Sequence, residues 1–252
     1  MSLANMSRQV VAPVGLAVAG VTSLAWYVTF LTTDSVTTLV MPAPFLGPSQ
    51  VALFFALMTT MMVAMMLPAI LPMVLGYRGM LKSNAAVSVG VSANVGTSVF
   101  MSAYFLVWAG FGVLALLGLT VLGLMGPMVG ATALIPGIVL IAAGAYQATS
   151  VKQACLRQCQ SPFTFMMHSW RKGLGGAFRM GLSHSMFCLG CCWLFMIALF
   201  VTGAMSLLWM GAVSVMIFVE KVGIRKSHVS RGIGLLLLAL GILVSVQAYR
   251  MI

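Results

Sequence analysis

The chain has 252 residues, of which 62% are hydrophobic and only 6% are charged, and its formal net charge is +11. Soluble globular domains carry about 45–50% apolar and about 25% charged residues, so this composition excludes most soluble enzymes, disordered chains and small secreted disulfide domains. It predicts an all-α, polytopic transmembrane helical bundle in which residues 1–252 form a single membrane domain.

Seven apolar stretches are long enough to be transmembrane helices, because a helix needs about 20 residues to cross the hydrocarbon core of a bilayer. In chain order they are residues 10–31, 50–76, 98–120, 127–147, 185–203, 204–220 and 232–250. The lipid bilayer is therefore the first partner that we expect for this chain.

The basic residues predict the orientation of this bundle. If all seven stretches cross the membrane, every Lys and Arg except Arg250 lies on the same side as the N-terminus. Loops rich in Lys and Arg mark the cytoplasmic side, so we expect the N-terminus inside and the C-terminus outside. Topology and attraction to anionic lipid then explain the positive charge, and no run of basic and aromatic residues indicates a nucleic acid partner.

Methionines form a stripe along the second predicted helix. The residues Met58, Met61, Met62, Met65, Met66 and Met73 fall within about 140° of one another around a helix axis. Thioethers are soft ligands that favour Cu(I), which makes Met62, Met65 and Met66 candidate metal ligands. Methionine also fills uneven gaps between packed helices, and the sequence leaves both interpretations open.

A first pair of cysteines lies in a long connection between predicted helices. We expect residues 148–183 to form a cytoplasmic or interfacial loop with short helices, the first of them over residues 149–160. Cys155 and Cys159 are four residues apart within this short helix, a spacing that puts both sulfur atoms on one helix face.

The other three cysteines follow a histidine at the start of the fifth predicted helix. At 100° per residue, His184, Cys188 and Cys191 fall within about 60° of one another, with Cys192 beside them. Both cysteine blocks lie at the predicted cytoplasmic edge and can meet there. Thiolates suit Cu(I), Zn(II) or an iron–sulfur cluster, whereas a redox-active pair and plain apolar packing are the alternatives.

Glu220 is the only glutamate of the chain, and Lys221 follows it at the end of the sixth predicted helix. An ionisable group at membrane depth is a candidate functional group by default. Glu220 is therefore either a metal ligand or neighbour of the thiol site, or one half of an ion pair with a basic residue of the long loop.

Catalytic motifs are missing from the sequence. It contains no phosphate-binding loop, no Ser/His/Asp set and no paired carboxylates. The sequence therefore favours a protein that is not an enzyme, although it leaves the class uncertain.

These motifs together resemble the DUF2182 family of bacterial and archaeal integral membrane proteins, which are predicted to bind metal. The likeness covers about residues 50–222 and is carried by residues 61–68 (MMVAMMLP), 146–162, 170–193 with CLGCCW at its end, and Glu220 with Lys221. The resemblance implies a multi-pass protein of the inner (plasma) membrane of a prokaryote.

The leading functional prediction is a membrane protein that binds a soft metal ion for metal handling or delivery. Its ligands would come from Cys155, Cys159, His184, Cys188, Cys191 and Cys192, extended by Met62, Met65, Met66 and Glu220. Copper is the expected ion, with zinc or an iron–sulfur cluster less favoured. Its partner would be a membrane enzyme complex or a metallochaperone. The alternatives are an accessory structural subunit of a membrane enzyme, such as a copper enzyme, and a membrane thiol oxidoreductase.

Overall fold

The computed structural model describes residues 3–40, 47–83, 90–123, 130–202, 206–223 and 226–251. Within these ranges the chain forms nine α-helices, one short 3-10 helix and no strand. The helices are α1 (Leu3–Val40), α2 (Pro48–Ser83), α4 (Ala93–Val121), η1 (Gly130–Leu134), α5 (Ile135–Tyr146), α6 (Ser150–Gln160), α7 (Pro162–Ser169), α8 (Gly173–Val201), α9 (Leu207–Val222) and α10 (Lys226–Met251). The all-α prediction is confirmed for this part of the chain.

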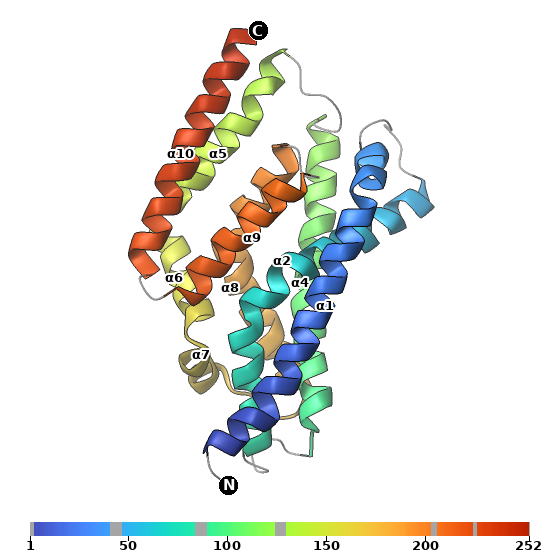
Figure 1. Cartoon of the computed structure of the whole chain (residues 1–252), viewed down its shortest axis with the longest axis vertical. Coiled ribbons are helices and arrows are strands. Elements are labelled where there is room, and N and C mark those ends of the chain that lie inside the picture. The colour runs from blue at the N-terminus through green and yellow to red at the C-terminus, as the bar shows by residue number, and fades with distance from the viewer. Residues whose placement is uncertain are drawn as a thin grey trace.

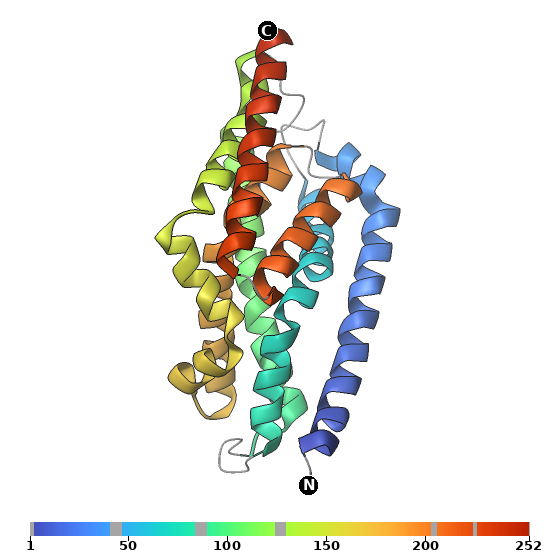
Figure 2. The same cartoon turned by 60° about the vertical axis from the view of Figure 1, so that its left-hand side comes forward.

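The long helices pack side by side in an elongated bundle, with the start of α1 and the end of α10 at opposite ends (Figures 1 and 2). Helix α1 packs against α2, α4 against α8, and α5 against α10. Of the helices long enough to span a membrane, α2 and α8 have the largest buried share, 61% and 56% of their most apolar windows. The centre of the bundle is therefore built around α2 and α8, which carry the methionine stripe and three of the cysteines.

Five of the described helices are long and apolar enough to cross a membrane, namely Val11–Thr32, Val51–Lys82, Ala93–Val121, Gly173–Val201 and His228–Arg250. A sixth span is possible if Thr132–Tyr146 and Ser150–Gln160, which meet at a bend of 69°, count as one. Helix α9 has only 16 residues and is shorter than a typical membrane-spanning helix. Residues 127–129 and 203–205, where three of the predicted stretches begin or end, lie outside the described residues.

The long loop predicted at residues 148–183 contains three helical segments. Thr149 accepts a hydrogen bond from the backbone N–H of Lys152 and caps α6, so the expected first short helix is confirmed. Helix α7 follows, and α8 begins at Gly173, well before the predicted start at residue 185. Glycine disfavours an isolated helix, but Gly181 lets α8 approach the backbone oxygen of Phe100 on α4. Tertiary packing thus extends α8 into a glycine-rich segment.

Helices α5 and α10 approach each other closely through glycines. A Cβ atom added to Gly241 would lie 2.8 Å from the backbone oxygen of Gly137, and one added to Gly144 would lie 2.7 Å from that of Gly234. Real Cβ atoms do not come so close to backbone, so a side chain at these positions forces the two helices apart.

We therefore expect Gly241→Ala to destabilise the folded chain by about 1–3 kcal/mol, the usual cost of overpacking. Thermal unfolding in detergent micelles measures the change. Gly110→Ala on α4 is the matched control, because nothing lies within 4 Å of a Cβ atom added there; it should be neutral or slightly stabilising. Equal stability of the two variants would contradict the close approach.

Candidate metal centre

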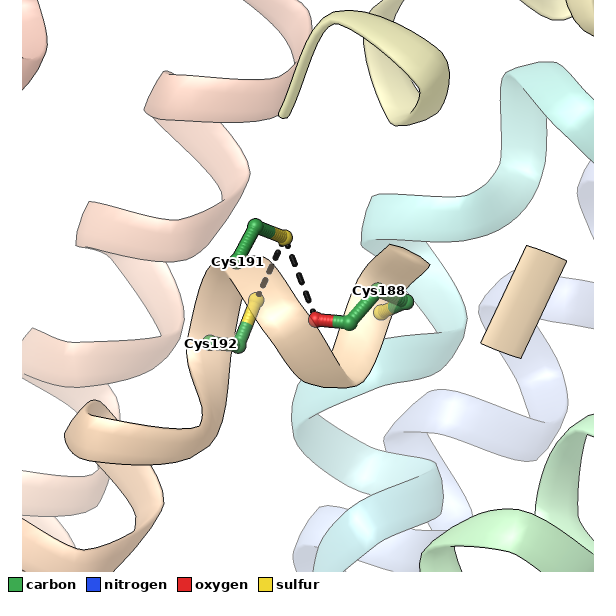
Figure 3. A group of neighbouring side chains, drawn as sticks. All are labelled: Cys188, Cys191 and Cys192. Carbon is green, nitrogen blue, oxygen red and sulfur yellow. Dashed lines mark hydrogen bonds between the residues drawn. The ribbon is translucent and has the colours of Figure 1, made fainter. Parts of the chain in front are cut away.

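Three buried thiols of α8 form a compact group. The sulfur atoms of Cys188, Cys191 and Cys192 all lie within 4.8 Å of one another, and each residue is at most 2% exposed. Figure 3 shows the sulfurs of Cys191 and Cys192 turned toward each other, 3.2 Å apart, with Cys188 one turn earlier. Cys188 is three residues before Cys191 and four before Cys192, and both spacings put side chains on the same helix face.

The second cysteine block lies against this group. The sulfur of Cys159 on α6 is 4.0 Å from that of Cys191. Cys155 packs on the same side of α8 at Gly190, where an added Cβ atom would lie only 2.7 Å from its sulfur. The bend between α5 and α6 thus brings the two cysteine blocks together, as the sequence allowed.

Two side chains from other helices contact Cys188. Lys221 of α9 donates a hydrogen bond to the Cys188 sulfur over 2.9 Å, and the Tyr104 hydroxyl of α4 lies 3.0 Å from the same atom. Tyr104 is fully buried, and Lys221 is only 6% exposed. The ammonium group therefore places a positive charge directly beside the sulfur group, in a region with little water to screen it.

His184 lies one turn before Cys188 and is also buried. Its ring packs among those of Phe100, Tyr104 and Phe165, with centroids 5.4 to 6.0 Å away. The Nδ1 atom is buried and has no hydrogen-bond partner within the described part of the chain. Buried polar atoms are normally paired, so this nitrogen has an unused lone pair or N–H, although His184 is not part of the group of three sulfurs that lie within 4.8 Å of one another.

The methionines of the predicted stripe are all buried, each at most 5% exposed. Met62, Met65 and Met66 belong to the same hydrophobic core as the three thiols, whereas Met73 belongs to a second core around Tyr77. Except for Met73, the stripe therefore belongs to the same hydrophobic core as the sulfur group and contributes the packing of α2 to it.

Glu220 forms a buried ion pair and is not part of the group of three sulfurs. Its carboxylate is 2.8 Å from the ammonium group of Lys152 on α6, and both side chains are at most 2% exposed. Lys152 also donates a hydrogen bond to Gln147, and its ammonium group lies 4.6 Å from the centre of the Phe195 ring. The expected pairing with a basic residue of the long loop is confirmed.

The sequence did not reveal the roles of Lys152, Lys221 and Tyr104. The sequence predicts a basic loop residue as one possible partner of Glu220 without identifying Lys152, it assigns no contact to Lys221, and Tyr104 belongs to no motif. The available signal was the Glu220-Lys221 dipeptide: at 100° per residue, neighbours on a helix face different sides. Glu220 reaches α6, and Lys221 reaches α8.

A group of three buried sulfurs that could hold a metal ion, in a bundle with five described helices long and apolar enough to cross a membrane, is consistent with a helical membrane protein that handles a metal. Consistent with this, the chain belongs to the family described as PpoB2, copper chaperone, which it matches over residues 55–244. Neither the comparison with curated proteins nor that with solved structures found a match.

Proposed function

We propose that this protein binds Cu(I) at the sulfur group of α8 and passes it to a partner, as a membrane-embedded copper chaperone. The carrying observation is the buried group of Cys188, Cys191 and Cys192, whose sulfurs lie within 4.8 Å of one another. Thiolates are preferred ligands of Cu(I), and no carboxylate belongs to this group among the described residues. Membership of a copper chaperone family supports the same ion.

The neighbouring donors would complete the site. Cys159, whose sulfur lies 4.0 Å from that of Cys191, would join the three thiols or replace one of them during transfer. His184, with its unpartnered Nδ1 atom among the described residues, is the second candidate for this role. Cys155, Met62, Met65, Met66 and Glu220 remain candidate ligands from the sequence, and for Glu220 the ion pair with Lys152 favours a structural role. The net charge of the loaded site favours two thiolate ligands over three. Cu(I) with two thiolates carries one negative charge, which the Lys221 ammonium group neutralises.

The predicted orientation places this site on the cytoplasmic side of the membrane, with the N-terminus inside and the C-terminus outside. The proposal follows the excess of Lys and Arg on that side and requires seven spans, which include the 12-residue α5 and the 16-residue α9. With the likeness to DUF2182, it assigns the protein to the inner membrane of a prokaryote. A metallochaperone would deliver the ion, and a membrane copper enzyme would receive it.

Metal analysis of purified protein tests the proposal. After anaerobic incubation with Cu(I) and removal of excess metal, the wild-type chain should retain roughly one ion, since one group of three sulfurs makes one site. The variant Cys188→Ser/Cys191→Ser/Cys192→Ser should retain less than about a fifth of that amount, because a hydroxyl is a poor ligand for Cu(I). Ser185→Ala, equally buried on the same helix, is the matched control and should retain copper.

Three results would contradict the proposal. Wild-type protein without bound copper in a stable large complex would favour the accessory-subunit alternative. A reversible disulfide between Cys188 and Cys191 formed in cells would favour the thiol oxidoreductase. Retention of copper by the triple serine variant would show that other residues bind the ion.

A further inference from the structure

A small pocket lies between α2 and α4, beside the sulfur group but separate from it. Four residues of α2 and three of α4 line it. Among the lining residues Thr59 is exposed at the surface of the bundle, whereas Met58, Met62 and Trp108 are at most 3% exposed. The pocket thus extends from the surface of the bundle to Met58 and Met62, near the N-terminal end of the methionine stripe.

The chemistry of the buried lining residues suits one class of ligand. Met58 and Met62 are one helical turn apart, so their thioether sulfurs come from the same face of α2. The indole of Trp108 can hold a cation over its ring, and its N–H is buried without a hydrogen-bond partner among the described residues. No carboxylate lines the pocket. Soft, uncharged donors with an aromatic ring favour a soft monovalent cation and disfavour Mg²⁺, Ca²⁺ or Zn²⁺.

The pocket is one side chain away from the thiols. Trp108 and Tyr104 are neighbours on one face of α4, with ring centroids 6.4 Å apart. The Tyr104 hydroxyl in turn lies 3.0 Å from the sulfur of Cys188. On the α2 side, Met62 is followed by Met65 and Met66 in the same core as the thiols. Trp108 and Tyr104 therefore connect the pocket to the sulfur of Cys188, and Met65 and Met66 belong to the same core.

We infer that this pocket is a second, weaker Cu(I) position, at which the thioethers of Met58 and Met62 hold the ion against Trp108 before or after it occupies the thiol group. The inference rests on the proposed function and adds a transit position to it. Copper keeps its +1 charge throughout: bonds to thioethers break as bonds to thiolates form, and any displaced thiol proton passes to the buffer.

A titration with Ag(I), a stable analogue of Cu(I), tests the inference in the full-length protein. Wild-type chain already loaded with one Cu(I) should bind a further ion with a change in tryptophan fluorescence. Met58→Leu/Met62→Leu, which conserves side-chain volume, should weaken this second binding at least about tenfold, equivalent to ~1.4 kcal/mol. Trp108→Phe should lose most of the fluorescence change. Met73→Leu, equally buried on the same helix but in the other core, should behave as wild type.

The same titration separates this inference from the proposed function. The triple serine variant of α8 should lose the tight site and keep the weak one, with its Trp108-dependent signal. Unchanged second binding in Met58→Leu/Met62→Leu overturns the pocket and leaves the thiol site intact. If the methionine variant fails to fold, Trp108→Phe decides, because a full fluorescence change in that variant also overturns the pocket.

Discussion

Lys221→Met is expected to weaken Cu(I) binding about 10- to 100-fold, the usual effect of removing a group that supports a metal ligand. The Lys221 ammonium group is 2.9 Å from the sulfur of Cys188 and neutralises the negative charge that two thiolates and Cu(I) carry. A net charge in an apolar core is costly, so without Lys221 the loaded site is less stable. Competition with a Cu(I) chelator of known affinity measures the change.

Two variants control for effects unrelated to this charge. Lys221→Arg keeps the positive charge and should restore most of the affinity. Lys172→Met removes a charge from an exposed position at the start of α8 and should leave binding unchanged. Wild-type affinity in Lys221→Met would show that the counter-charge of the sulfur group comes from elsewhere.

Glu220→Leu is expected to destabilise the folded chain by about 3–5 kcal/mol, because it leaves the buried ammonium group of Lys152 without its counter-ion. The two side chains are 2.8 Å apart and at most 2% exposed. Lys152→Met should destabilise the folded chain by a similar amount, because it leaves the buried carboxylate of Glu220 without its counter-ion. Unfolding in detergent micelles, followed by tryptophan fluorescence, measures both.

The double variant Lys152→Met/Glu220→Leu provides the decisive comparison. Replacing both charges with apolar side chains of similar size removes the desolvation cost as well as the attraction, so much of the lost stability should return. A loss of less than about 1 kcal/mol in each single variant, as for a surface pair, would show that the pair is not buried in the native bundle.

The cysteine cluster shows how much of the site could be predicted from sequence. His184, Cys188 and Cys191 share a face because they are three or four residues apart on one helix, and that part of the geometry is local. The contact of Cys159 with Cys191 depends on the 69° bend between α5 and α6, for which the sequence carries no quantitative signal. Lys221 reaches Cys188 only because α9 packs beside α8.

The fold, like the site, was predicted from the sequence only in part. Composition and the length of the apolar stretches predict a helical membrane bundle, because a bilayer allows few other structures and imposes a minimum helix length. The early start of α8 was missed, because glycine propensity argues against a helix there and only the close packing of Gly181 on α4 reverses it.

The sequence by itself determined the membrane class, the thiols as the soft donors and the helical face that carries them, because composition and short-range spacing follow from local chemistry. Only the tertiary structure decided which charged side chains contact which partners. In the folded chain Glu220 pairs with Lys152, and Lys221 donates a hydrogen bond to Cys188. Helices α2, α4 and α9 enclose the sulfur group. Contacts between residues far apart in the chain depend on helix packing, which no single segment encodes.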